Sequence, residues 1–227
     1  MARYIVPLIF GIAGIAVLVG LGVWQMQRLA WKEGVLADIE ARIAADPVEL
    51  PAAPDPEGDR YLPVQVTGQV GDQALRVLVS QKQVGAGYRV ISTLDMGERR
   101  ILLDRGFIKV GRDIPDPPQG EVTVTGNLHW PDDRNSSTPD NDVADNTWFA
   151  RDLDQMAGVL DTEPLLVVTR ETSFSDDPLT PLPVDTSHIA NDHLEYAITW
   201  FSLAAVWAAM TGYFLWRMRQ SAKGEGT

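Results

Sequence analysis

The sequence predicts a membrane protein in which a two-helix transmembrane hairpin carries an extramembrane, antiparallel β-rich domain, a barrel or a sandwich with one or two short helices. Two observations predict the hairpin: there is no charged side chain from Tyr4 to Gln27, and none from Tyr196 to Trp216. Each run is as long as the roughly 20 apolar residues that a helix needs to cross a bilayer. A third observation predicts the domain: between the runs, short segments alternate apolar and polar residues, as strands do.

The first apolar run favours a membrane anchor over a cleaved signal peptide. A signal peptide has an apolar core of roughly 7–15 residues, followed by small residues at the cleavage site. Here the run is longer and ends in the bulky Trp24, followed by Gln25 and Met26. A buried helix of a soluble core is the alternative for either run. Two such runs at opposite ends of the chain make that alternative the weaker one.

The charges that flank the two runs predict the orientation. Arg217, Arg219 and Lys223 follow the second run, and Arg3 precedes the first. Because positively charged flanks stay in the cytoplasm, we expect both termini inside and the middle domain outside. No Arg-rich, Ser-rich import sequence precedes the first run. We therefore expect a multi-pass protein of the bacterial inner membrane, with its main domain in the periplasm.

The chemistry of the middle of the chain excludes several classes of function. Between Glu33 and Tyr196 there are 30 acidic and 13 basic side chains, a balance that repels phosphates, so nucleic acid is not an expected partner. The chain contains no cysteine. That excludes disulfides, Cys-ligated zinc, iron–sulfur clusters and the thiolate site of a copper chaperone.

Local patterns divide the chain into five segments. After the first span, Leu36, Ile39 and Ile43 recur at helical spacing, and this amphipathic extension is expected to end near Asp46-Pro47. Four prolines then mark an extended linker. The segments are the first transmembrane helix 1–27, the helical extension and Pro-rich linker 28–57, the periplasmic β-rich domain 58–192, the second transmembrane helix 193–217 and the cytoplasmic tail 218–227.

The β-rich domain is expected to contain six or seven strands. Gly71-Asp72 would turn the strand of residues 61–70 into the strand of residues 73–81. Gly97-Glu98 would close a short hairpin further along the chain. Residues 148–161 predict one short helix, since apolar residues recur on one of its faces.

Few patterns in the domain point to catalysis or to metal binding. The acidic loop from Asp140 fails as an EF-hand, because Asp145 and Arg151 occupy the positions that need Gly and Glu. No G-x-S-x-G, H-E-x-x-H or P-loop pattern occurs. Ser187 beside His188 is adjacency in sequence, not the geometry of a nucleophile and its base. We expect no enzyme; a membrane-tethered hydrolase that uses these two residues stays an alternative.

Polar and aromatic residues gather at the end of the first span and at the start of the second. In a hairpin these two places lie at the same depth in the membrane. On each helix, three of them share a face by their spacing: i, i+4, i+7 on the first and i, i+3, i+7 on the second. An aromatic belt with polar anchors is one interpretation. A binding site is the other, in which an imidazole is an axial haem ligand and a guanidinium pairs with the propionates. The candidate residues are Trp24, Gln25, Arg28, Trp31, His193, Tyr196 and Trp200.

Small residues on both spans favour close packing of the two helices into a hairpin, because they let backbones approach. A chance background of small residues, common in any span, is the alternative. The residues concerned are Gly11, Gly14, Gly20, Gly22, Ala204, Ala205, Ala208, Ala209 and Gly212.

Five segments, spread in order over almost the whole chain, resemble the Surfeit locus protein 1 family. The first and last are the most specific, whereas the linker and the loop 131–145 match loosely. The segments are GLGVWQMQRLAWK (20–32), LLDRGF (102–107), GEVTVTG (120–126), NTWFARDLDQMA (146–157) and NDHLEYAITWF (191–201).

The resemblance implies a non-enzymatic factor for the biogenesis of cytochrome c oxidase. Such a factor would bind haem a, as cargo rather than as a catalytic group, and aid its insertion into oxidase subunit I. His193 matches the proposed haem ligand, and Arg105 and Gly106 match a motif that maintains the fold. The expected partners are oxidase subunit I, haem a synthase and the lipid bilayer. A scaffold that stabilises assembly intermediates without binding haem is the alternative. Trp24, Gln25, Arg28 and Trp31 match the family's first-helix signature.

Overall fold

The computed structural model describes residues 2–82, 84–187 and 189–224. The chain forms two compact units: Met1–Asp38 together with Ser187–Thr227, and Ile39–Thr186. The five-segment division stays a prediction. His188, one of the two residues of the hydrolase alternative, lies outside the described residues.

Two long helices make up the first unit. Helix α1 spans Ala2–Ile43 and helix α3 spans His193–Gly224. Both contain a stretch long and apolar enough to cross a membrane, and only 11% and 6% of these stretches is buried. A core helix of a soluble protein would be mostly buried, so the apolar surface of these helices is suited to lipid. The predicted fold class, with two apolar helices flanking a β-rich domain, is confirmed.

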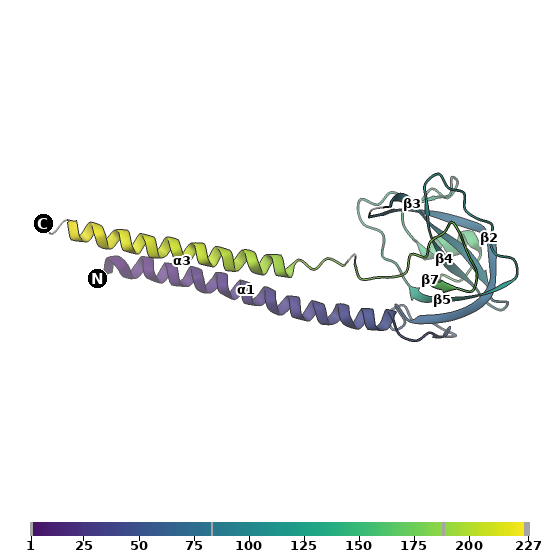
Figure 1. Cartoon of the computed structure of the whole chain (residues 1–227), viewed down its shortest axis with the longest axis horizontal. Coiled ribbons are helices and arrows are strands. Elements are labelled where there is room, and N and C mark those ends of the chain that lie inside the picture. The colour runs from purple at the N-terminus through teal and green to yellow at the C-terminus, as the bar shows by residue number, and fades with distance from the viewer. Residues whose placement is uncertain (1, 83, 188, 225–227) are drawn as a thin grey trace. The chain divides into compact units, whose positions relative to one another are not determined.

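Glycines on α1 receive large side chains of α3. A Cβ atom at Gly11 would clash with Thr211, one at Gly14 with Trp207, and one at Gly22 with Phe201. The Trp207 indole Nε1 also donates to the Gly11 carbonyl oxygen at 3.2 Å. The expected close packing of the two helices is therefore found, and Figure 1 shows them running side by side, with the first turns of α1 beside the last turns of α3.

Only some of the predicted small residues take part in this packing. Gly20 and Gly212 have open space where a Cβ atom would be. On α3, Ala204 is buried, whereas Ala205 and its neighbours Ala208 and Ala209 are exposed. For these five residues the background interpretation was the right one.

The second unit is built on a closed, five-stranded barrel. Strand β2 pairs with β3 on one edge and with β5 on the other, and the order β2-β3-β4-β7-β5 returns to β2. The spatial order β5-β2-β3-β4 is that of a Greek key. Most ladders are antiparallel, as predicted, but β4–β7, β1–β2 and β2–β6 are parallel. The strands are β1 Val48–Glu49, β2 Pro63–Gln81, β3 Gly85–Asp95, β4 Arg100–Lys109, β5 Glu121–His129, β6 Thr147–Trp148 and β7 Leu166–Thr172.

One predicted turn is wrong and the other is confirmed. At Gly71-Asp72 the chain does not turn back; β2 continues through a bulge between Val70 and Ala74. The bulge bends this long strand, so that its first half pairs with β5 and its second half with β3. At Gly97 the backbone has a positive φ of 90°, and the chain there closes the β3–β4 hairpin.

Both faces of the central strands are buried. On one face, Leu103 and Val167 belong to an apolar cluster with residues of β2 and β5. On the other face, Leu102 and Leu166 pack with Trp148 and with the short helix α2, Leu153–Leu160. Helix α2 begins after Asp152, whose side chain accepts from the Gln155 backbone N–H. Its extent is shorter than the predicted 148–161.

The end of α1 is anchored within this second unit. The buried Asn127 amide donates to the carbonyl oxygens of Ile43, at 3.0 Å, and Tyr61, at 2.9 Å. Arg170 donates to the Ile43 carbonyl as well, at 3.2 Å. These donors satisfy a carbonyl group that the helix end leaves without an intrahelical partner, and they explain why α1 ends at Ile43, before the predicted Asp46-Pro47.

The Asp104-Arg105-Gly106 segment locks a long loop onto the barrel. Arg105 is buried and donates to both carboxylate oxygens of Asp176, at 2.9 and 2.6 Å. Gly106 has φ 119°, and a Cβ atom there would lie 2.3 Å from the Thr180 carbonyl oxygen, so only glycine fits. Buried Asp104 pairs with Arg89. The contacts agree with the role in fold integrity that the resemblance implied.

Candidate functional site

A polar pair lies between the two apolar helices. The Gln25 side chain is only 8% exposed, and its Oε1 lies 2.8 Å from Nδ1 of the half-buried His193. Gln25 is three residues beyond Gly22, and thus on the face of α1 that packs against α3. His193 shares its face of α3 with the buried Ala197 and Ala204. The small residues that bring the backbones together therefore also bring these two polar groups together.

The other predicted site residues on α1 are more exposed than Gln25. Trp24 and Trp31 are 51% and 56% exposed. The Arg28 guanidinium carbon lies 4.4 Å from the centre of the Trp31 ring, in a cation–π contact. Arg28 and Trp31 thus share a face of α1, as their spacing predicted. Among the described residues, the side chain hydrogen-bonded to His193 is Gln25 rather than Arg28.

On α3, the predicted residues divide in a similar way. Tyr196 is 55% exposed, whereas Trp200 is half-buried. The backbone N–H of Tyr196 donates to the Asp192 carbonyl, in the first turn of the helix. Lys32 of α1 donates to the Ala190 carbonyl just ahead of α3. This bond ties the first helix to the start of the second near the Gln25–His193 pair. The role of all seven residues in binding stays a prediction.

The arrangement around His193 suits a prosthetic group better than a bare metal ion. Within the described part of the chain, no three His, Cys, Asp or Glu side chains come together as metal ligands. A haem brings four ring nitrogens of its own, so one imidazole is enough to hold its iron. Nδ1 of His193 is occupied by Gln25, while Nε2 has no hydrogen bond to any described residue. The donor set thus fits a haem held by one axial ligand.

An apolar groove of about 680 Å³ runs between the same helices, further from their predicted outer ends. Its lining offers hydrocarbon and aromatic surface, including the rings of Phe10 and Trp207, whose centres are 5.7 Å apart. No charged side chain lines it. The groove accommodates apolar chains, and nothing in it would orient a polar group.

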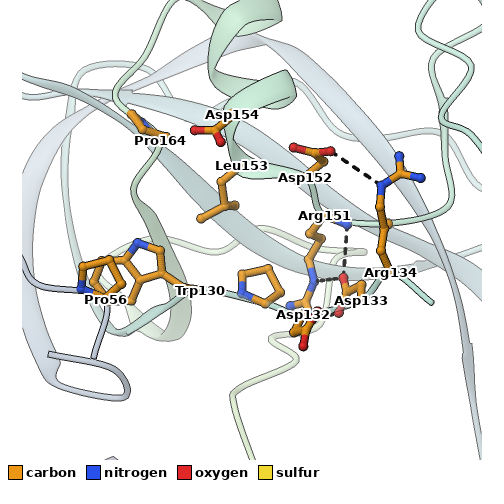
Figure 2. Close-up of a pocket in the computed structure, with 12 residues that line it drawn as sticks. Pro56, Trp130, Asp132, Asp133, Arg134, Arg151, Asp152, Leu153, Asp154 and Pro164 are labelled. Atoms are coloured by element: carbon orange, nitrogen blue, oxygen red, sulfur yellow. Dashed lines mark hydrogen bonds and ion pairs between the residues drawn. The ribbon is translucent and has the colours of Figure 1, made fainter. Parts of the chain in front are cut away.

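The outer unit has a second hollow, a groove of about 470 Å³ shown in Figure 2. Trp130, Pro56 and Leu153 give it apolar walls. Its floor carries an ion pair in which Arg151 donates to both carboxylate oxygens of Asp133, at 2.7 and 2.9 Å. Sequence reasoning missed this groove because residues 131–145 were interpreted only as a loop, and the two partners of the ion pair lie 18 positions apart.

Electrostatics at this groove stabilise the ion pair. Burial would raise the pKa of Asp133, but the hydrogen bonds and the charge of Arg151 outweigh burial and hold that pKa below its ordinary value. Burial would lower the pKa of Arg151, but the hydrogen bond and the charge of Asp133 outweigh burial and raise that pKa. Nearby, burial and the Arg151 charge lower the pKa of His129 to about 3. His129 therefore stays neutral at physiological pH, with its ring stacked on Tyr61.

Comparison with known sequences decides the family. The sequence model of the SURF1 family matches residues 12–205. This chain belongs to the SURF1 family. Surfeit locus protein 1 of Homo sapiens is 32% identical over 213 residues, covering 82% of this chain and 70% of the human protein. The protein of that name from Rattus norvegicus is 30% identical, over 82% of this chain and 68% of the rat protein.

A SURF1-like protein of Monosiga brevicollis is also similar, with 32% identity over 84% of this chain and 80% of its own length. The resemblance seen in the five sequence segments is thus confirmed. SURF1-family proteins are known generally as cytochrome oxidase assembly factors. The matched range includes both the Gln25–His193 pair and the barrel, so the family extends over the membrane helices as well as the outer unit.

Proposed function

We propose that this SURF1-family protein is a non-enzymatic biogenesis factor that binds haem a beside His193 and aids its insertion into subunit I of cytochrome c oxidase. The proposed setting is the bacterial inner membrane, with both termini in the cytoplasm and the barrel in the periplasm. The observation that carries the proposal is one half-buried imidazole at the helix–helix interface, with its Nδ1 bonded to Gln25 and its Nε2 unbonded within the described chain.

The residues around His193 have separable tasks in this proposal. His193 Nε2 would bind the iron, and the haem would supply an apolar, redox-active macrocycle as cargo. Arg28 is exposed and held over Trp31, so its guanidinium is available to pair with a propionate. Trp24, Tyr196 and Trp200 would cover the macrocycle with aromatic surface and exclude water from it. The apolar helices keep the cargo at membrane depth.

A single protein ligand suits delivery. A haem held by two strong axial ligands must break both bonds before it leaves, whereas one axial bond can be exchanged for the ligands of an acceptor. Gln25 and His193 are on different helices, so a small separation of the helices would change the surroundings of the ligand. Such a site holds its cargo and still releases it to subunit I.

The His193→Ala variant tests the proposal. We expect the full-length protein, co-expressed with the haem a pathway and purified in detergent, to lose its haem a absorption band while it stays inserted and folded. His129→Phe is the matched control, since it removes a histidine of the outer unit and should leave haem loading unchanged. Stoichiometric haem a with an unchanged spectrum in His193→Ala would rule out this residue as the ligand.

A scaffold that binds no haem makes the opposite prediction. The wild-type protein would then purify without a haem band and yet restore oxidase assembly in cells that lack it. Haem loading and oxidase assembly, measured in the same strains, separate the two functions.

The acidic outer unit is the proposed docking surface for oxidase subunit I or haem a synthase. Exposed charge pairs are screened by salt. Co-purification with the partner should therefore weaken as ionic strength rises. Retention that is independent of salt would argue against docking through these charges.

A further inference from the structure

We infer that Gln25 is a positioning residue: its side-chain oxygen accepts the Nδ1–H of His193 and holds the ring in the tautomer whose Nε2 carries the free lone pair. This inference rests on the proposed function, because it names the atom that would bind iron. A neutral imidazole has one N–H and one lone pair, and the partner of one nitrogen decides the state of the other.

The surroundings of Gln25 leave it few other uses. Its side chain is 8% exposed, and among the described residues of α1 and α3 it is the one buried polar residue. A buried amide oxygen without a partner is costly, and the one side-chain hydrogen bond found for Gln25 within the described residues is the contact with His193, at 2.8 Å. The carbonyl oxygen Oε1 faces Nδ1, so Nδ1 donates and Nε2 is left unprotonated.

Close packing one turn away fixes both partners. Gly22, three residues before Gln25, lies against the Phe201 ring. Ala197, four residues after His193, is 1% exposed. Backbones held this close leave the two side chains little freedom to turn away. A hydrogen bond to the far nitrogen of a ligating histidine also makes the ligating nitrogen more basic. Gln25 would thus set both the orientation and the donor strength of His193.

A purely structural bond between the helices is the competing explanation. It would be served equally well by either tautomer, because an amide can accept from Nδ1–H or donate to an unprotonated Nδ1. It would also leave haem affinity unchanged whenever the hairpin stays folded. The two explanations therefore differ in the tautomer of the haem-free protein and in the response of haem affinity to substitution.

The tautomer is measured first, on the haem-free full-length protein in detergent with ¹⁵N-labelled histidine. We expect the His193 signals of a protonated Nδ1 and an unprotonated Nε2, assigned by their absence in His193→Ala. In Gln25→Leu the preference for Nδ1–H should be lost. A protonated Nε2 in the wild-type protein would overturn the inference, whatever the protein does with haem.

Haem affinity is measured next, with haem a loaded by co-expression and competed away by apomyoglobin. Gln25→Leu removes the acceptor and should release haem roughly 10–100-fold more readily, the range found for partners of ligating histidines. Gln25→Glu keeps an acceptor and should restore retention. Gln27→Leu, an exposed glutamine on the same helix, is the matched control and should not differ from wild type.

The outcomes distinguish the two levels of the proposal. Equal haem retention in Gln25→Leu and wild type would overturn the positioning role while His193 remains the ligand. Haem retention in His193→Ala would overturn the proposed function even with the tautomer as inferred.

Discussion

The two histidines described here are both half-buried, yet their environments give them different chemistry. His129 lies beside the cations Arg60 and Arg151, and burial and charge together keep it neutral, with a pKa of about 3. Its ring stacks on Tyr61, and its Nδ1 has no hydrogen-bond partner among the described residues. His193 instead has an amide oxygen against one nitrogen. Neighbours, not residue type, decide which imidazole can serve as a ligand.

His129 predicts a loss of stability in acid. The unfolded chain binds a proton on His129 below about pH 6.5, whereas the folded protein binds it only near pH 3. Protonation of His129 therefore has little effect on the unfolding free energy above pH 6.5. As the pH falls from 6.5 toward 3, it progressively favours the unfolded chain and lowers that free energy. Between pH 7.5 and pH 5 we expect this residue to cost about 2 kcal/mol of unfolding free energy.

Urea unfolding of the detergent-solubilised protein, followed by tryptophan fluorescence, measures this loss. His129→Phe keeps a ring against Tyr61 and removes the titration, so its unfolding free energy should fall less over the same pH range. Asp133 does not affect the result, because its pKa is lowered from 3.8 and the stability that it contributes is lost only in more acidic solution than this range. An equal fall in both proteins would show that other groups govern the acid sensitivity.

At the residue scale, the sequence could suggest candidate residues but not the contacts between them. The spacing of Trp24, Arg28 and Trp31 predicted a shared face, and Arg28 does lie over Trp31. It could not show which face of α1 turns toward α3. That choice is made by Gly11, Gly14 and Gly22, whose missing side chains admit Thr211, Trp207 and Phe201. Gln25 continues this row of glycines, a signal that could have identified it as the partner of His193.

At the scale of elements, the apolar runs predicted both long helices because length and lack of charge are enough for that purpose. Strand boundaries were harder to predict. Gly71-Asp72 reads as a turn, but in the fold it belongs to a bulge that bends β2 around the barrel. Local sequence favours a turn or a bulge equally here, and the pairing of β2 with two different strands decides between them.

The helix–helix packing predicts a selective disulfide. A Cβ atom at Gly11 would lie 3.1 Å from Cβ of Thr211, near the spacing of roughly 3.5–4.5 Å in disulfides. Because the chain has no cysteine, Gly11→Cys with Thr211→Cys introduces the sole thiol pair. We expect oxidation in membranes to cross-link it, seen as faster migration on a non-reducing gel.

The matched control for this cross-link is the pair Gly20→Cys with Gly212→Cys, since a Cβ atom at either position would meet no atom of the other helix within 4 Å. This pair should stay reduced under the same conditions. Cross-linking of both pairs with equal efficiency would mean that the helices lack a fixed packing face.

At the scale of the whole molecule, a compact domain is inserted between two apolar helices. The unit Ile39–Thr186 is connected at one end to α1 and at the other to the segment that leads into α3. Sequence predicted this insertion and the barrel-or-sandwich class. It did not predict the closure of the barrel, because closure depends on the pairing of β2 with β5 and of β4 with β7, which are far apart in the chain.

The proposed orientation predicts the accessibility of two exposed serines. Ser136 lies in the outer unit, and Ser221 lies near the end of α3 beside the basic residues that should stay in the cytoplasm. In intact spheroplasts, a membrane-impermeant maleimide should modify Ser136→Cys. It should modify Ser221→Cys only after the membrane is permeabilised. The reverse pattern would place the barrel in the cytoplasm and contradict the proposed periplasmic location.

The Gln25–His193 bond also makes the site sensitive to sliding of one helix along the other. A shift of α3 by one helical turn, about 5.4 Å, is larger than the 2.8 Å that separates the two side chains. Such a shift would also move Thr211 and Trp207 out of their places against Gly11 and Gly14. A partner that displaces α3 must therefore undo the fit of the hairpin and free the imidazole in a single movement.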